Sequence, residues 1–364
     1  MVPAVSASSA LTVLVPGDLD TRTGGYGYDR RVIAGLRAAG WTVDVLCLDG
    51  SFPFPTPDAR ARAAATLAGI PDHTLVLVDG LALGALPDEI AAHAARLAIV
   101  ALVHHPLAAE TGLTKDQAAA LEDSERRALA AVRAVVVTSR ATATALDAYG
   151  VASDRVTPVE PGTDPAPVAR STIDGPSAAG DVSLLCVATL TPRKGHELLL
   201  DALASVPHRA WRLRCAGRID RDARTTSRIL ERVRAHGFGD RVELVGDLDP
   251  RRLAVEYDRA DLFVLATLYE GYGMAVAEAL ARGLPVVATA TGAIPDLVGD
   301  GGIVIAPGDL EALASALTAM LGDADLRARL AAGARRARER LPTWDQAVAA
   351  MAAALERARE LPRG

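Results

Sequence analysis

The sequence is poor in lysine, cysteine and aromatic residues, and these scarcities exclude some classes of protein. Among 364 residues there are two lysines and three cysteines, and aromatic residues make up 4%. The cysteines, Cys47, Cys186 and Cys215, are too few and too scattered for a disulfide framework. We expect them to be buried thiols in a reducing cytoplasm. No cluster with metal-ligand spacing is visible, so we expect no bound metal.

Long hydrophobic runs and an excess of positive charge are also absent. The longest apolar runs, such as Leu97–Val103, are far shorter than the ~20 residues of a membrane-spanning helix. The first ten residues lack the basic and apolar segments of a secretory signal. The formal net charge of −6 argues against a nucleic-acid partner, because that binding depends on clustered cations. These absences predict a cytoplasmic protein without a transmembrane segment.

The composition and its periodicity predict two α/β domains. Hydrophobic residues make up 50% of the chain and charged residues 23%, which is enough apolar mass for two cores. Short β-branched runs alternate with segments of helical period, the pattern of a parallel sheet covered by helices. The expected strands are Leu11–Val15, Thr42–Leu48, Thr74–Val78, Ile99–Val103, Val135–Thr138, Val182–Val187, Trp211–Ala216, Val242–Val245, Leu262–Leu265, Val286–Ala288 and Ile303–Ile305.

The alternation of strand and helix patterns is interrupted once, at Pro161–Asp181. This segment is rich in Pro, Gly, Ser and Ala and has no apolar period, so we interpret it as an interdomain linker. We place the boundary near residue 170, between a first domain of residues 1–170 and a second of residues 171–343.

The chain closes with Ala- and Arg-rich segments of helical composition. We expect helices from Leu310 to the end, interrupted at Leu341–Thr343 because Pro342 cannot continue a helical ladder. The last helix can then pack elsewhere in the molecule. The arginine-rich stretch Arg327–Arg340 has no large aromatic face, so a solvated helix is favoured over peripheral contact with a membrane.

Parallel α/β sheets bind ligands outside the carboxyl ends of their strands, so the loops there are the candidates for chemistry. After the first strand, Gly24 and Gly25 let the backbone approach a ligand at a helix start, although a plain turn is the alternative. The loop is not a dinucleotide fingerprint, because Tyr26 and Tyr28 stand where that motif has small residues. A nicotinamide dehydrogenase is therefore disfavoured.

Two further loops carry histidine or paired cations. His104, with His105 beside it, follows the strand Ile99–Val103, where it can donate to a substrate hydroxyl or be an ordinary satisfied polar residue. Arg193 and Lys194 stand in a turn before a helix, and two cations with a helix N-terminus suit a diphosphate. A solvated turn is the alternative, and it is less common for one of only two lysines.

The loop after Leu262–Leu265 has the most specific pattern. Glu270 precedes a helix and Glu278 lies inside it, so that both acids can face one ligand. Such a pair can hold hydroxyls of a sugar and of a ribose, while backbone N–H groups between them hold phosphate or sugar oxygens. Two unrelated acids would leave the glycines on either side of Tyr272 unexplained.

The run Glu270-Gly271-Tyr272-Gly273 through Glu278, followed by Gly283-Leu284-Pro285-Val286-Val287, resembles the Glu-x7-Glu signature of retaining glycosyltransferases of the GT-B fold, specifically glycosyltransferase family 4. The resemblance extends over most of the chain. It includes Gly24-Gly25, the His104 region, Pro161-Gly162-Thr163-Asp164, Pro192-Arg193-Lys194-Gly195, Ala216-Gly217-Arg218, Val242–Gly246 and Pro307-Gly308-Asp309. It implies two Rossmann-like domains facing each other across a cleft, with a C-terminal helix, residues 344–364, crossing back to complete the first.

The resemblance also implies roles for individual residues. Glu270 would contact hydroxyls of the donor sugar, Glu278 the ribose, and Lys194 the diphosphate. His104 would touch the transferred sugar, with His105 as the alternative one residue on. Further donor contacts would come from Gly24, Gly25, Gly271, Tyr272, Gly273, Met274 and Ala275.

The chain departs from the family pattern at Ala188-Thr189, where the family often has Gly-Arg. The first phosphate-binding arginine is therefore missing there, and Arg193 or Arg218 is the expected substitute. The Asp-x-Asp sequences at residues 18–20 and 247–249 look like the metal motif of the other large glycosyltransferase fold. We interpret both as turns, because neither has a second group of ligands nearby.

The sequence thus predicts a retaining, metal-independent glycosyltransferase that moves a sugar from a UDP- or GDP-sugar to an acceptor hydroxyl, in glycan, glycolipid or small-molecule glycoside synthesis. No cofactor is expected, because the nucleotide-sugar is a substrate. The alternatives are a nucleotide-sugar epimerase or hydrolase of the same fold, and a catalytically inactive nucleotide-binding module. Retention of Glu270, Glu278, His104 and Lys194 together counts against the inactive module.

Overall fold

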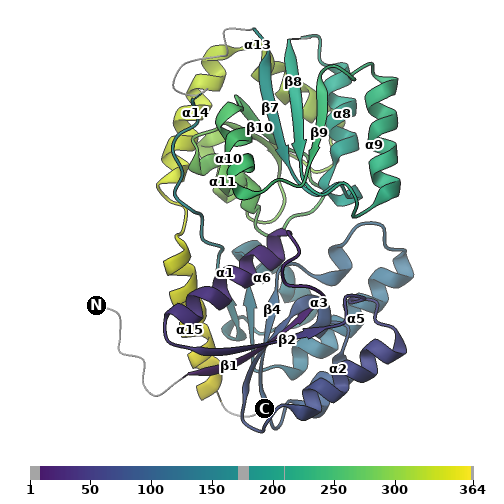
Figure 1. Cartoon of the computed structure of the whole chain (residues 1–364), viewed down its shortest axis with the longest axis vertical. Helices are drawn as coiled ribbons and strands as arrows, with labels where there is room; N and C mark the ends of the chain where they lie inside the picture. Colours follow the sequence, from purple (N-terminus) through teal and green to yellow (C-terminus); the bar gives the residue numbers. More distant parts are fainter. Residues whose placement is uncertain (1–8, 171–179, 209, 362–364) are drawn as a thin grey trace. The chain divides into compact units, whose positions relative to one another are not determined.

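The computed structural model describes residues 9–170, 180–208 and 210–361, and contacts divide the chain into two compact units. The first unit combines Met1–Gly162 with Pro342–Gly364, and the second is Thr163–Leu341. The division falls before residue 170, and residues 171–179 of the expected linker lie outside the described part. Figure 1 shows each unit as a sheet flanked by helices.

The first unit is built on a parallel sheet that, in the described residues, has six strands in the order β2-β1-β3-β4-β5-β6. The strands are β1 (Ala10–Pro16), β2 (Thr42–Leu48), β3 (Leu75–Asp79), β4 (Ala98–Val103), β5 (Ala134–Val137) and β6 (Val156–Pro158). The helices are α1 (Gly24–Ala38), α2 (Pro57–Gly69), α3 (Gly80–Leu83), α4 (Pro87–His93), α5 (Lys115–Ala131) and α6 (Arg140–Ala145). Because β2 and β3 lie on opposite sides of β1, the strand order reverses between β1 and β3.

The second unit repeats this design over its described residues, with six parallel strands in the order β12-β11-β10-β7-β8-β9. The strands are β7 (Val182–Val187), β8 (Trp211–Ala216), β9 (Val242–Gly246), β10 (Leu262–Leu265), β11 (Val286–Thr289) and β12 (Gly302–Ile305). The helices are α8 (His196–Ser205), α9 (Ala223–Ala235), α10 (Pro250–Arg259), α11 (Met274–Ala281), α12 (Ile294–Val298), α13 (Leu310–Gly322) and α14 (Ala324–Arg338). Here the order reverses between β7 and β10.

Apolar runs specify the central strands of both sheets. β3, β4 and β10 are buried along their whole length, as expected for parallel strands covered on both faces. Every predicted strand is present. The sequence did not predict β6, because none of its three residues is buried and they form no apolar run.

Two local predictions need correction. Cys186 and Cys215 are buried as expected, but Cys47 is exposed, because β2 is the edge strand of its sheet. The helical region after Leu310 also breaks at Asp323, where the sequence predicted no break. The carboxylate of Asp323 accepts the N–H of Leu326 at 2.8 Å and begins a new helix there.

The last helix, α15 (Trp344–Glu360), belongs to the first unit, as the family resemblance implied. It follows a break at Pro342 and lies beside α1 (Figure 1). The two helices approach closely, because a Cβ on Gly35 of α1 would overlap Val348 of α15. The rings of Trp344 and Tyr28 lie 6.1 Å apart across the same interface.

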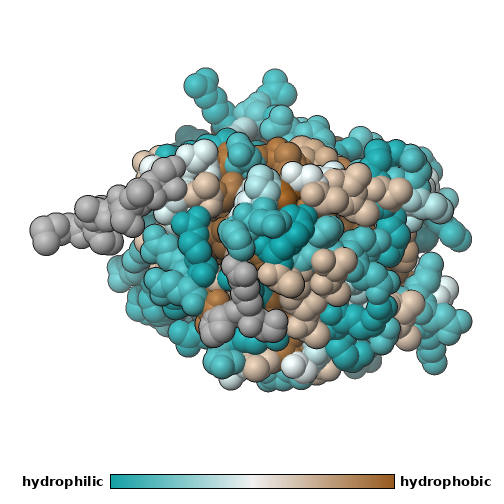
Figure 2. All heavy atoms as spheres, turned by 90° about the horizontal axis from the view of Figure 1, so that it is seen from below, coloured by the Kyte–Doolittle hydropathy of each residue, from teal (hydrophilic) through white to brown (hydrophobic). Residues whose placement is uncertain are grey.

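None of the helices in the described residues is both long and apolar enough to cross a membrane. Polar side chains cover most of the face seen in Figure 2, and hydrophobic residues show between them in small groups.

Candidate functional site

In the second unit, the loops after β7 and β10 meet where the strand order reverses, the place at which open α/β sheets bind ligands. Gly195 ends the first loop with a φ of 68°, and a Cβ on it would overlap the carbonyl oxygen of Ala266 in the second. Only glycine permits this approach. The N–H of Leu268 donates to the carbonyl of Arg193 at 2.7 Å, so the Arg193-Lys194 turn is fixed on the β10 loop.

This arrangement brings the predicted cations to a predicted carboxylate. Lys194 Nζ forms an ion pair with Glu270 Oε2, and Arg193 Nη1 lies 3.9 Å from the same oxygen. The side chains of Arg193, Lys194 and Glu270 are 16%, 17% and 17% exposed, so their charges are only weakly screened by water. Arg193 also donates to the carbonyl of Tyr269 at 2.8 Å. One carboxylate therefore faces two cations.

The Glu270–Gly273 loop leads directly into α11. Gly273 occupies the N-cap with a φ of 100°, and the N–H groups of the first turn have no acceptor within the helix. Tyr272 is 4% exposed and packs against Ala277 and Ala293, so its ring anchors the loop. The main chain of Gly271 through Ala275 is thus held at the start of a helix, where anions bind favourably.

Glu278 lies farther along α11 and is half-buried. Its Oε2 accepts a hydrogen bond from the hydroxyl of Tyr257 at 2.9 Å. Burial raises the pKa of Glu278, while Tyr257 and the nearby charge of Arg282 oppose the rise. The sequence did not identify Tyr257, because in α10 it has the appearance of an ordinary core aromatic.

Arg193 and Arg218, the two candidates for the missing family arginine, have different partners. Arg218 follows β8 and pairs with Asp220 through two contacts of 3.0 Å. Its carbonyl accepts the N–H of Leu190, which fixes the β8 loop beside the β7 loop. Arg193, by contrast, joins the Lys194–Glu270 cluster.

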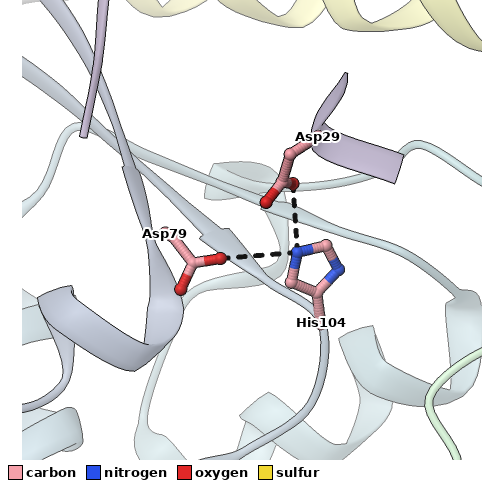
Figure 3. Close-up of side chains that lie close together, drawn as sticks. All are labelled: Asp29, Asp79 and His104. Carbon is pink, nitrogen blue, oxygen red and sulfur yellow. Dashed lines mark ion pairs between the residues drawn. The ribbon is translucent and has the colours of Figure 1, made fainter. Parts of the chain in front are cut away.

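The first unit has a charged cluster at its own strand reversal, formed by His104 after β4, Asp79 at the end of β3 and Asp29 on α1 (Figure 3). His104 Nε2 lies 3.2 Å from Asp29 Oδ1 and 3.6 Å from Asp79 Oδ2. Asp79 also caps α3, because its Oδ1 accepts the N–H of Leu81 at 2.8 Å. The sequence predicted His104 but neither aspartate.

Electrostatics in this cluster favours a protonated histidine. Burial alone lowers the pKa of His104, but the charges of Asp29 and Asp79 outweigh it and raise the pKa to about 10. Burial also raises the pKa of Asp29, and His104 opposes that rise. One ligand atom from each of the three residues lies within 4.8 Å of the others, a spacing that could also hold a metal ion.

Gly25 and Tyr28 enclose the ring of His104. A Cβ on Gly25 would lie 3.5 Å from His104 Cδ2, an ordinary van der Waals distance, so this part of α1 lies directly against the ring. Tyr28 meets the ring edge-on, at 5.6 Å between centroids. His105 is placed differently, with its Nε2 3.6 Å from Glu110.

The two Asp-x-Asp sequences have local structural roles. Asp18 accepts the N–H of Asp20 at 2.9 Å, which forms a turn. Asp249 caps α10 by accepting the N–H groups of Arg251 and Arg252. Neither pair belongs to the group of possible metal ligands found in the described residues.

Two family models match the chain. "Glycosyltransferase Family 4" matches residues 30–167, and "Glycosyl transferases group 1" matches residues 181–323. Among curated relatives, a D-inositol 3-phosphate glycosyltransferase of Xylanimonas cellulosilytica is 37% identical over 62% of this chain and 57% of its own length. The lipopolysaccharide core biosynthesis mannosyltransferase LpsB of Rhizobium meliloti is 37% identical over 40% of this chain and 42% of its own. The chain thus spans about half the length of these relatives.

Solved structures resemble the chain over nearly its whole length. Sucrose-phosphate synthase of Thermosynechococcus elongatus has a TM-score of 0.80 at 24% identity, covering 96% of this chain and 98% of that one. Anabaena HepE in complex with UDP and glucose has a TM-score of 0.75 at 19% identity, covering 96% and 100%. At these identities the likeness establishes the fold, which is GT-B.

Proposed function

Because the chain belongs to glycosyltransferase family 4, we propose that it transfers a sugar from a nucleotide-sugar donor to an acceptor hydroxyl, with retention of anomeric configuration and without a metal ion. The observation that carries the proposal is the Lys194–Glu270 ion pair, with Arg193 beside it, at the strand reversal of the second unit. Two cations held together at the end of the strands suit the binding of a diphosphate.

Donor binding would exchange the partners within this cluster. The diphosphate takes the place of Glu270 opposite Lys194 and Arg193, because two phosphate groups carry more charge than one carboxylate. Glu270 then accepts hydrogen bonds from hydroxyls of the donor sugar. Glu278 binds the ribose, and the main chain of Gly271–Ala275 at the start of α11 binds donor oxygens.

The same groups lower the barrier to transfer. As the bond between the anomeric carbon and the diphosphate breaks, negative charge grows on the leaving phosphate. Lys194, Arg193 and the N-terminus of α11 meet that charge from fixed positions, which stabilises the transition state more than the bound donor. The acceptor hydroxyl attacks from the face that the diphosphate leaves and passes its proton to the leaving phosphate, so the anomeric configuration is retained. His104 donates a hydrogen bond to the transferred sugar.

The neighbours and relatives guide the choice of substrates to test. HepE was solved with UDP and with UDP-glucose, so UDP-sugars are the first donors and GDP-sugars the second. The D-inositol 3-phosphate glycosyltransferases suggest phosphorylated polyols among the acceptors. The cytoplasmic location stays a prediction.

The proposal is tested by incubating the chain with UDP- and GDP-sugars, with and without an acceptor panel, in excess chelator. We expect acceptor-dependent release of nucleoside diphosphate and a product with the anomeric configuration of the donor. Sugar release or epimerisation that needs no acceptor would instead establish the hydrolase or epimerase. Binding without turnover would favour the inactive module, and activity restored only by Mg²⁺ or Mn²⁺ would contradict metal independence.

A further inference from the structure

His104 is the member of the Asp29–Asp79–His104 cluster that a ligand can reach. Its side chain is 19% exposed, whereas those of Asp29 and Asp79 are 2% and 3% exposed. Both carboxylates lie on the Nε2 side of the ring, and the other nitrogen, Nδ1, points away from them (Figure 3). The aspartates can therefore act on a substrate only through the histidine.

A positive charge beside Asp29 stabilises its buried carboxylate. Neither of its carboxylate oxygens has a hydrogen-bond partner in the described residues. A buried carboxylate in that state is costly unless a cation lies beside it. His104 Nε2, 3.2 Å away, is the nearest group that can carry the charge.

From this geometry we infer that Asp29 and Asp79 are positioning residues, which hold the His104 ring as an imidazolium and direct its Nδ1–H toward the transferred sugar. The inference rests on the proposed function in naming the sugar as the target. The assignment of charge and ring orientation does not depend on it. A neutral ring with its proton on Nε2 would offer an acceptor at Nδ1, whereas the imidazolium offers a donor there.

The other side chains near the His104 ring do not change its assignment as an imidazolium. On α1, Tyr28 contacts the ring by its edge, and the Arg30 guanidinium donates to the carbonyl of Thr21 at 3.0 Å. In the loop after β4, His105 lies 3.6 Å from Glu110. The two aspartates are thus the acidic groups that face His104 Nε2 in the described residues, and they favour its charged form.

A metal ion is the rival explanation for the same three side chains. It would occupy Nε2 and leave that nitrogen without a proton, whereas the ion pair keeps both ring nitrogens protonated. Nitrogen-15 NMR of the histidine-labelled chain distinguishes these states, and the signals that vanish in His104→Gln identify the residue. Metal analysis of the purified chain gives an independent readout.

We expect the His104 signals to be those of an imidazolium at pH about 8, where an ordinary histidine is neutral. Asp29→Asn should convert them to those of a neutral ring, while Asp44→Asn, on an exposed position of β2, should leave them unchanged. Neutral His104 signals in the unaltered chain, or one equivalent of bound metal, would overturn the inference whether or not the chain is a transferase.

Kinetics separates positioning from a structural role. Asp29→Asn should lower kcat by up to about a hundredfold, the scale of loss when a reacting group is misplaced, with little change in nucleoside diphosphate affinity. The losses from Asp29→Asn and His104→Gln should not add in the double variant, because the aspartate acts through the histidine. Additive losses, or a lower Tm with unchanged kcat, would contradict the positioning role. Failure of all forms to bind nucleotide would count against the proposed function instead.

Discussion

Lys194, in the loop after β7, forms an ion pair with Glu270, in the loop after β10. The two residues are far apart in sequence and meet because β7 and β10 are neighbours at the strand reversal. Glu270 therefore holds the lysine where the proposed diphosphate would bind.

Substitution of Lys194 should affect turnover more than binding. Lys194→Ala removes a cation whose proposed partner gains charge in the transition state, so we expect kcat to fall by roughly 10²- to 10³-fold with a modest rise in donor KM. The measurement is the rate of nucleoside diphosphate release at saturating donor.

Lys115→Ala is the matched control, because Lys115 is the other lysine of the chain and lies exposed at the start of α5. It should keep the activity of the unaltered chain. If Lys194→Ala folds and retains full kcat, Arg193 or Arg218 carries the phosphate and the assignment of Lys194 is wrong.

Glu278 should contribute to donor affinity. The proposed contact is with the ribose, which does not change during transfer, so Glu278→Gln should raise donor KM and leave kcat nearly unchanged. Loss of a charge-assisted hydrogen bond of about 1.5 to 3 kcal/mol corresponds to a rise of roughly ten- to hundredfold. Tyr257→Phe, which leaves the carboxylate but removes its 2.9 Å donor, should give a smaller rise. A fall in kcat at unchanged KM would show that Glu278 acts on the transition state.

Gly195 should be required for the contact between the two donor loops. Gly195→Ala places a methyl group against the carbonyl of Ala266, in addition to the cost of a positive φ. Gly237→Ala is the control, because Gly237 has a φ of 66°, close to the 68° of Gly195, and no atom lies within 4 Å of its added Cβ. We expect Gly237→Ala to cost about 1 to 2 kcal/mol in unfolding free energy and Gly195→Ala to cost more. If urea unfolding shows the same loss of unfolding free energy for both variants, the predicted clash with Ala266 is wrong.

Glu125 should make stability depend on pH. It is fully buried under the loop that follows His104, where its Oε2 accepts the N–H of Leu107 at 2.9 Å. Burial raises the pKa of Glu125 from 4.5 to about 7, against the opposing effect of this hydrogen bond. Between these values the folded chain keeps a proton that the unfolded chain releases, so stability falls as pH rises through this window, by roughly 3 kcal/mol at most.

Glu125→Gln should reduce that fall, because glutamine keeps the acceptor for Leu107 and does not titrate. Urea unfolding at about pH 5 and about pH 8 measures the difference. Glu122→Gln, a partly exposed substitution in the same helix, is the control and should behave like the unaltered chain. The prediction fails if Glu125→Gln and the unaltered chain lose the same stability between the two pH values.

The sequence predicted which charged residues come together in the second unit better than in the first. Lys194 and Glu270 each follow an apolar strand, and the doubly wound pattern places such loops along one edge of the sheet. Tyr257, which supports Glu278, was missed because a helical tyrosine has no local signal of the carboxylate it will meet.

Asp29 and Asp79 show more clearly what sequence patterns alone cannot predict. Asp29 lies among tyrosine and arginine in a helix and looks like a surface residue, yet packing of α1 on the sheet buries it beside His104. Asp79 offered a weak signal, because it ends an otherwise apolar strand. Asp79 meets His104 because β3 and β4 are neighbours in the sheet. The residue pattern of one strand does not show which strand will lie beside it.

The central proposal, a nucleotide-sugar donor site built on Lys194 and Glu278, is tested most directly by calorimetric titration with UDP, GDP, ADP and TDP. We expect one of these nucleotides to bind the unaltered chain and Lys115→Ala equally, in the presence of chelator. Lys194→Ala and Glu278→Gln should bind it more weakly while remaining folded by circular dichroism. Absence of binding by all four nucleotides, or equal binding by both site variants and the unaltered chain, would contradict a donor site at this strand reversal.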